Sequence, residues 1–182
     1  MSDPRIYAAT ETLRNGGVVT VRAIRGDDRQ AVLEAFRGLD RQSVYTRFFT
    51  FKKGLTETEV RQLTEPDFDH VVALVVVEDT GNGEMLVGGA RYCSEAALRR
   101  SRTAELAFVT AERCKGRGIA GLLLRHLVLI ARDQGLSQLD AEVLAQNRAM
   151  LKVFERSGLS MRLSHEANVV HVSLLIDEAA DA

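Results

Sequence analysis

The 182-residue chain has little cysteine, little proline and no tryptophan. Its two cysteines, Cys93 and Cys114, form no CxxC pair and no Cys/His pattern, so neither a disulfide framework nor a structural metal site is expected. Proline occurs only as Pro4 and Pro66, which fits one compact unit without a long linker. We therefore expect a reduced protein that binds no metal and is cytoplasmic.

An excess of one charge and long apolar runs are also absent. Lys and Arg total 24 and Asp and Glu total 25, a net charge of -1, which excludes a chain-wide basic field for nucleic acid. The local basic run at residues 98–102 is interpreted as a solvated loop. No apolar run approaches the roughly 18 residues of a membrane span, and residues 1–5 lack a signal-peptide core. We expect neither a nucleic-acid nor a membrane partner.

The composition, 46% hydrophobic and 27% charged, is that of a globular protein. Apolar and β-branched runs predict strands at 18–24, 71–78, 85–93, 103–110, 138–144 and 169–176. Helical spacing and caps predict helices at 28–38, 43–48, 56–63, 119–134 and 147–157. This order predicts a mixed α/β fold, with an antiparallel meander followed by two crossovers.

The domain organisation is expected to be simple, because the chain has no internal repeat and no low-complexity linker. We expect one domain over residues 15–176, an N-terminal extension at residues 1–14 and a flexible tail at residues 177–182. Exposed strand edges would allow a homodimer.

The loop between the strand at 103–110 and the helix at 119–134 carries the most informative pattern. The first turn of a helix leaves amides without partners, and the helix dipole adds positive charge there. Gly116 and Gly118 let the backbone approach an anion closely, and Lys115 and Arg117 add charged donors. This loop therefore predicts a phosphate site, with a purely structural turn as the alternative. It is neither a Walker A sequence nor a GxGxxG fingerprint.

Residues 104–120 resemble the cofactor motif of the GCN5-related N-acetyltransferase (GNAT) superfamily, Gln/Arg-x-x-Gly-x-Gly/Ala. Lys115 stands where Gln or Arg is usual, and Ala120 is an accepted variant at the last position. Residues 147–159 resemble the family's Asn-led helix that ends in Gly-Phe. Two motifs in this order are more specific than either alone.

A further resemblance, to the catalytic domain of bacterial protein lysine acetyltransferases, involves residues 17–25, 43–49 and 64–74, and extends over about 15–176. It implies a central, mostly antiparallel sheet of six to seven strands with helices on both faces. It also implies acetyl-CoA as cosubstrate and an acceptor amine, most of all a protein lysine side chain. Acetylation of a small-molecule amine and a non-catalytic CoA-binding regulatory module remain the alternatives.

The resemblance also assigns roles to residues. A free lysine has a pKa near 10.4 and must lose a proton before it attacks a thioester, so a carboxylate base is needed. Glu105 matches the glutamate that serves as general base, although a strand glutamate that merely faces water is the alternative. The cofactor contacts that it implies are the backbone of Phe108, Val109 and Thr110 for the pantetheine arm, and Lys115, Gly116, Arg117, Gly118, Ile119 and Ala120 for the phosphates.

Three further positions complete the predicted site. Asn147 is a candidate cofactor contact and also a candidate helix N-cap, and both roles can hold together. Phe154 occupies the position of the tyrosine acid used by many family members. The thiolate must therefore be protonated by another group or leave unassisted, which a thiol pKa near 8.5 allows. His70, beside Asp67 and Asp69, is a reserve base.

Overall fold

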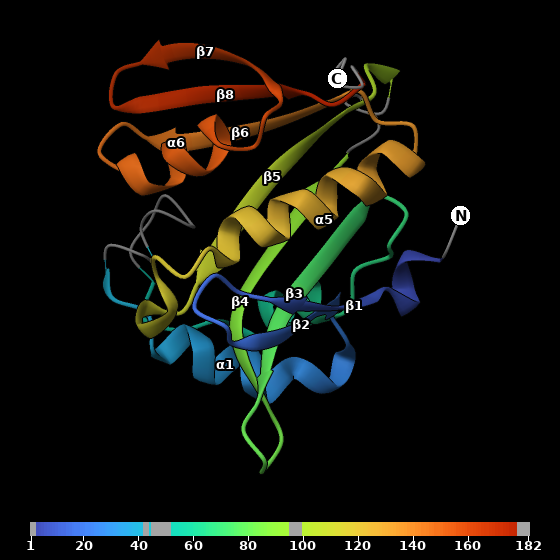
Figure 1. The fold of residues 1–182 in the computed structure, drawn as a ribbon, viewed down its shortest axis with the longest axis vertical. Helices are drawn as coiled ribbons and strands as arrows, with labels where there is room; N and C mark the ends of the chain where they lie inside the picture. Colours follow the sequence, from blue (N-terminus) through green and yellow to red (C-terminus); the bar gives the residue numbers. More distant parts are fainter. Residues whose placement is uncertain (1–2, 42–43, 45–51, 95–99, 178–182) are drawn as a thin grey trace.

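A computed structural model describes residues 3–41, 44, 52–94 and 100–177 (Figure 1). Most of the helix expected at 43–48 lies outside these residues. The described chain forms one eight-stranded sheet in the order β1-β2-β3-β4-β5-β6-β8-β7. The strands are β1 Ala8–Thr12, β2 Val18–Ala23, β3 Val71–Asp79, β4 Glu84–Cys93, β5 Thr103–Thr110, β6 Gln138–Leu144, β7 Ser160–Glu166 and β8 Val169–Leu175.

The mixed α/β fold with a mostly antiparallel sheet is confirmed, but the sheet has eight strands instead of six or seven. The two strands that the sequence did not predict, β1 and β7, are the two edges of the sheet. An edge strand can remain largely exposed, so it needs no run of apolar residues, and six of the seven β7 residues are exposed. β1 pairs antiparallel with β2, so Ala8–Thr12 of the expected N-terminal extension belongs to the sheet.

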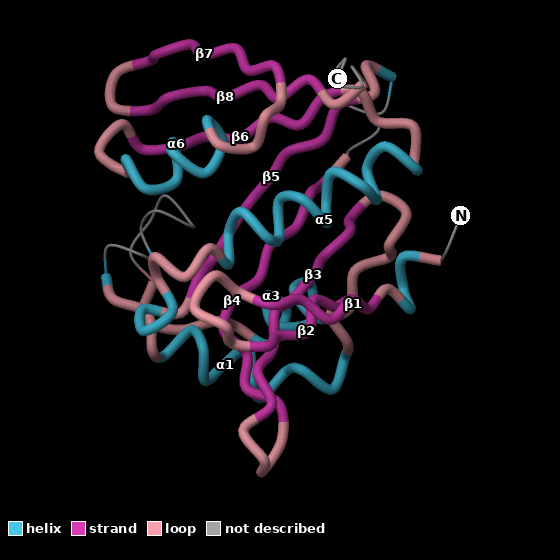
Figure 2. Tube along the Cα trace, viewed as in Figure 1, coloured by secondary structure: helices cyan, strands magenta, loops and turns pink. Residues whose placement is uncertain are grey.

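The helices are α1 Arg29–Arg37, α3 Glu57–Thr64, α5 Ile119–Asp133 and α6 Arg148–Glu155, with short 3-10 turns η1 Pro4–Ile6, η2 Gly26–Asp28 and η3 Glu112–Cys114. α5 runs along β3, β4 and β5, and α6 lies beside α5 (Figure 2). α1 packs against α3 and β4. No helix among the described residues is long and apolar enough to cross a membrane.

Helix ends follow the predicted caps. At the start of α3, Thr56 Oγ1 accepts a hydrogen bond from the amide of Glu59 at 3.2 Å, and the Glu59 carboxylate accepts one from the amide of Thr56 at 2.9 Å. This reciprocal pair is the predicted capping box. Gly135 follows α5 with a φ of 78°, the left-handed conformation expected of the residue that ends a helix.

The core lies around β3, the continuous apolar run of the sequence. Its residues 72–77 are all buried, as expected of a central strand covered on both faces. α5 contributes a buried stripe that includes Leu123, Leu124 and Leu127. The sheet and α5 thus form a rigid support for the loop that joins β5 to α5.

Candidate active site

β5 and β6 form the one parallel pair of the described sheet, and they stay together for only three residues. Thr103–Glu105 is in register with Gln138–Asp140, and no pairing follows. Beyond Glu105, β5 remains paired with β4 while β6 remains paired with β8, so the two strands diverge (Figure 1). Backbone groups of residues 106–110 that point toward β6 therefore have no partner within the described sheet. A ligand with amide groups can pair with them there.

The glycine loop has the backbone conformation that the sequence predicts. Gly116 and Gly118 have φ values of 78° and 87°, in the left-handed region that favours glycine. Gly118 is the N-cap of α5, and no side chain caps this end. No described residue accepts a hydrogen bond from the amides of Gly116, Gly118, Ile119 or Ala120. These donors remain available to an anion.

Gly88 sets how closely the start of α5 approaches the sheet. A Cβ atom at Gly88 would lie 2.5 Å from Cγ2 of Ile119, a distance that real Cβ atoms do not tolerate. Ile119 is the first residue of α5 and is 1% exposed. This role was not predicted from the sequence. Its signal is the Gly-Gly pair at 88–89 inside a strand, which indicates close approach of another element.

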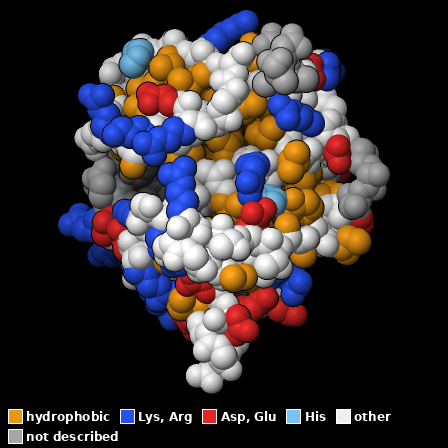
Figure 3. All heavy atoms as spheres, in the orientation of Figure 1, with side chains coloured by type: hydrophobic (Ala, Val, Ile, Leu, Met, Phe, Trp, Pro, Cys, Tyr) orange, Lys and Arg blue, Asp and Glu red, His pale blue; other side chains and the backbone are white. Residues whose placement is uncertain are grey.

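A cavity of about 1320 Å³ lies over the start of α5, between the end of β5, α6 and the turn that joins β1 to β2. Figure 3 shows a hollow on this side of the molecule with Lys and Arg side chains gathered around it. All ten predicted cofactor-contacting residues line the cavity: Phe108, Val109, Thr110, Lys115, Gly116, Arg117, Gly118, Ile119, Ala120 and Asn147.

The two loop cations differ from expectation in their side-chain contacts. The Nζ of Lys115 lies 2.6 Å from Oε2 of Glu112, and the guanidinium of Arg117 is paired with Glu78 on β3. The hydrogen bond to Glu78 raises the pKa of Arg117. Both cations are therefore already engaged with carboxylates and anchor the loop. The main-chain amides of Gly116, Gly118, Ile119 and Ala120 have no such partner among the described residues.

Asn147 caps the start of α6, and Phe154 packs α6 against β5. The Asn147 side chain accepts a hydrogen bond from the amide of Met150 at 3.2 Å, so the predicted N-cap is confirmed. Phe154 is 1% exposed and packs edge-to-face on Phe108, with ring centroids 6.0 Å apart. The ring therefore gives apolar support to the diverging strand and offers no proton.

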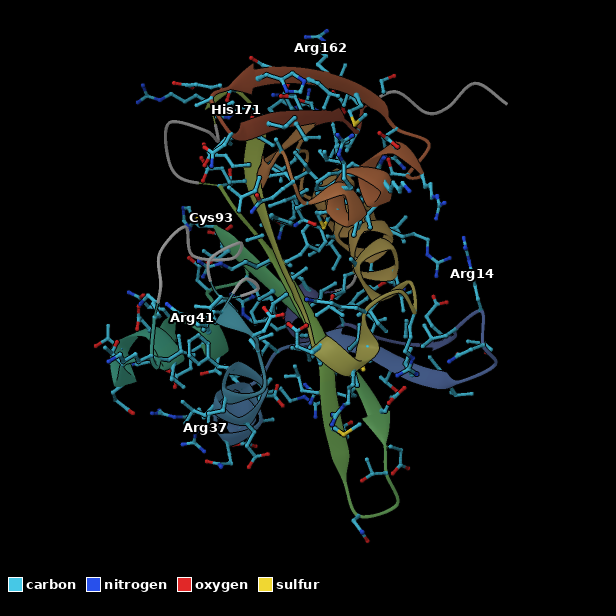
Figure 4. All side chains as sticks on the ribbon, turned by 90° about the vertical axis from the view of Figure 1, so that its left-hand side faces the viewer. Arg14, Arg37, Arg41, Cys93, Arg162 and His171 are labelled. Atoms are coloured by element: carbon cyan, nitrogen blue, oxygen red, sulfur yellow. The ribbon has the colours of Figure 1, made fainter. Side chains whose placement is uncertain are left out.

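Glu105 lies on the other face of the sheet. It is in register with Cys93 on β4 and Asp140 on β6, and residues paired across strands point to the same face. Figure 4 shows Cys93 on the side of the sheet occupied by α1, away from α5 and α6. Glu105 is exposed there, at the position where β5 and β6 separate. The opening between the strands thus has the cavity on one face and Glu105 on the other.

His70 is not brought to this position. Its Nδ1 lies 3.1 Å from Oδ2 of Asp67, just before β3. β3 is separated from β5 by β4, so the reserve base lies two strands away from Glu105. The geometry favours Glu105 over His70 as the group beside the opening.

A buried network that the sequence did not predict lies next to the cavity. His126 on α5 is 4% exposed; its Nδ1 is hydrogen-bonded to the Tyr7 hydroxyl and its Nε2 lies 3.0 Å from Oε1 of Glu11. Glu11 also pairs with Arg125 at 2.7 Å, and both line the cavity. Burial lowers the pKa of His126. The network joins β1 to α5, and it was missed because β1 itself was not predicted.

Comparison with known proteins agrees with this geometry. The model of the acetyltransferase (GNAT) family matches residues 41–159. The acetyltransferase PA5475 of Pseudomonas aeruginosa is 29% identical over 140 residues, which cover 77% of this chain and 74% of that protein. The acetyltransferase Pat of Mycolicibacterium smegmatis is 28% identical over 147 residues, which cover 80% of this chain but only 42% of Pat.

A solved structure resembles the whole fold. The GNAT domain of S. lividans PAT superimposes with a TM-score of 0.83 at 31% identity, covering 92% of this chain and 96% of that domain. The family model spans more than half of the chain, and it includes the glycine loop, the diverging strands and the Asn147 helix. The chain therefore belongs to the GNAT family and is an acetyl-CoA-dependent acetyltransferase.

Proposed function

We propose that this acetyltransferase transfers the acetyl group of acetyl-CoA to a protein lysine side chain, with Glu105 as general base. The observation that carries the proposal is the separation of β5 from β6 directly after the Glu105–Asp140 pair. This opening gives a thioester lying in the cavity access to an amine that approaches from the opposite face.

The cavity residues fit the parts of acetyl-CoA. Free amides of Gly116, Gly118 and Ile119 at the start of α5 would hold the pyrophosphate. The unpaired backbone edge of residues 106–110 would pair with the pantetheine amides, and the side chain of Phe108 would pack on the arm. An amide at 108–110 would stabilise the negative charge that develops on the thioester oxygen.

The position of Glu105 beside the opening supports its role as the base. It would accept a proton from the lysine ammonium, directly or through a water, so that the neutral nitrogen attacks the acetyl carbonyl and the C–S bond breaks. The thiolate leaves either unassisted or with a proton from a group other than Phe154, which has none to give.

The charge of the acceptor face supports a cationic substrate. Asp140 and Glu142 of β6 lie on the same face of the sheet as Glu105 of β5. Asp140 is the register partner of Glu105, and Glu142 lies two residues further along β6. The sequence alone does not show this group of carboxylates, because its members meet only when β5 and β6 pair. Carboxylates that surround the opening attract an ammonium group.

The test is acetylation kinetics of the Glu105→Gln variant with acetyl-CoA and a lysine-containing protein or peptide. We expect kcat to fall by about 10²- to 10⁴-fold at neutral pH, the usual contribution of a general base, with unchanged CoA affinity. Activity of the variant should recover as pH rises, because the amine then loses its proton without assistance.

Glu166→Gln is the matched control, since it removes a carboxylate from the same face but on edge strand β7. An unchanged kcat in Glu105→Gln, or equal losses in both variants, would remove Glu105 from its role. Turnover of polyamines or other small amines together with none of protein lysines would assign the alternative acceptor class.

A further inference from the structure

The cavity is strongly cationic. Among the described residues that line it, seven are basic and one, Glu11, is acidic. The basic residues are Arg14, Lys115, Arg117, Arg125, Arg132, Lys152 and Arg156. An excess of this size over a single cavity favours a ligand with several negative charges.

Four of the seven cations already have partners. Lys115 pairs with Glu112, Arg117 with Glu78 and Arg125 with Glu11. The Nε of Arg132 donates a hydrogen bond to the carbonyl of Ile176 at 2.6 Å. By contrast, no described residue forms an ion pair or a side-chain hydrogen bond with any of the remaining three, Arg14, Lys152 and Arg156.

These three cations border the cavity from two elements. Arg14 is exposed in the turn between β1 and β2, and Figure 4 shows it on the side of the sheet that carries α5 and α6. Lys152 and Arg156 are exposed and lie four residues apart at the end of α6. Like charges at this spacing repel each other on a helix surface. Positive charge near the carboxyl end of a helix is favourable, which accounts for Lys152 and Arg156. It does not account for Arg14, which is not on a helix.

Coenzyme A carries negative charge at two separate places. Its pyrophosphate lies between the pantetheine arm and the nucleoside, and its ribose bears a 3′-phosphate at the end remote from the thioester. With the thioester at the end of β5 and the pyrophosphate on the loop at 116–118, the nucleoside must extend away from the opening between the strands. The three unpaired cations line the same cavity, Arg14 from the turn between β1 and β2 and the other two from the end of α6.

We propose that Arg14, Lys152 and Arg156 form the subsite for the 3′-phosphate, so that the enzyme discriminates acetyl-CoA from its dephospho form. The inference rests on the proposed placement of acetyl-CoA in this cavity. Arg14 lies outside residues 41–159, the part that the family model matches, so the N-terminal hairpin contributes to cofactor selection. A phosphate dianion accepts charge-assisted hydrogen bonds from guanidinium and ammonium groups, which a ribose hydroxyl cannot replace.

The test compares the affinities of CoA and dephospho-CoA by calorimetry, for the wild-type chain and for the triple variant Arg14→Gln/Lys152→Gln/Arg156→Gln. The wild type should prefer CoA by at least about tenfold, as expected for charge-assisted hydrogen bonds that are partly exposed. The triple variant should lose this preference and bind dephospho-CoA as the wild type does. Added salt should reduce the preference of the wild type, because exposed charges are screened.

Arg148→Gln is the matched control, because Arg148 is an exposed arginine on α6 that does not line the cavity. It should keep the wild-type preference. Three results would overturn the 3′-phosphate subsite while leaving the placement of acetyl-CoA intact. They are equal affinity of the wild type for CoA and dephospho-CoA, equal weakening of both in the triple variant, and loss of the preference in Arg148→Gln. Absence of binding for both nucleotides would overturn the proposed placement of acetyl-CoA as well.

Discussion

Gly88 on β4 lies directly against the first residue of α5, Ile119. A methyl group there would lie 2.5 Å from Cγ2 of the buried Ile119, so the start of α5 would have to move away from the sheet. Overpacking of this kind destabilises a core by typically about 1–3 kcal/mol. We therefore expect Gly88→Ala to lower the free energy of unfolding and to weaken CoA binding, because the amides at 116–120 move with the helix. Denaturant unfolding and calorimetry measure the two effects.

Gly89→Ala provides the comparison at the residue scale. A Cβ at Gly89 would meet no atom closer than 3.5 Å, which is an ordinary contact. Stability and CoA affinity should stay near those of the wild type. If the two alanine variants behave alike, close packing of Ile119 on Gly88 does not position the loop.

At the scale of elements, the buried His126 of α5 contacts Glu11 of β1. Burial lowers the pKa of His126 from its ordinary value of 6.5, whereas the charge of Glu11 opposes that shift. With a lowered folded-state pKa, the unfolded chain binds the proton more readily. The stabilising contribution is thus complete above about pH 6.5 and decreases as pH falls toward the folded-state pKa.

The measurement is the free energy of unfolding between pH 7.5 and 5, at roughly half-unit steps, for the wild type and His126→Gln. The loss of stability on acidification should be smaller in the variant, which has no buried imidazole to protonate. His165→Gln, which removes an exposed histidine from β7, is the matched control for loss of an imidazole outside the core. The same slope in wild type and His126→Gln would contradict the role given to burial of His126.

The elements that the sequence predicts well are those with a strong local pattern. α5 has a buried stripe and a glycine after its last turn, β3 has an unbroken apolar run, and α3 has its capping box. The edge strands β1 and β7 lack such a pattern, because an edge strand can remain largely exposed and needs no run of apolar residues. The helix expected at 43–48 falls mostly on residues that the structure does not describe.

At the scale of the whole molecule, the site arises where the sheet divides into β1–β5 and β6–β8–β7. The glycine loop and the Asn147 helix could be predicted because each is one continuous motif. Three contacts could not be predicted, since each joins segments that are distant in sequence. They are the pairing of Arg117 with Glu78, the approach of Ile119 to Gly88, and the register of Glu105 with Asp140. The hairpin that brings Arg14 to the cavity was missed because its first strand, β1, has no apolar run.

The central claim is that the main-chain amides at the start of α5 bind the pyrophosphate of CoA. Its most direct test is a calorimetric titration of CoA into the wild-type chain and into Gly118→Ala. Gly118 has a φ of 87°, and a side chain in this conformation costs about 1–2 kcal/mol, so the variant should turn its amides out of place. We predict saturable binding to the wild type and an affinity reduced by about tenfold in the variant. No binding by the wild type, or equal affinity in both proteins, would contradict the account.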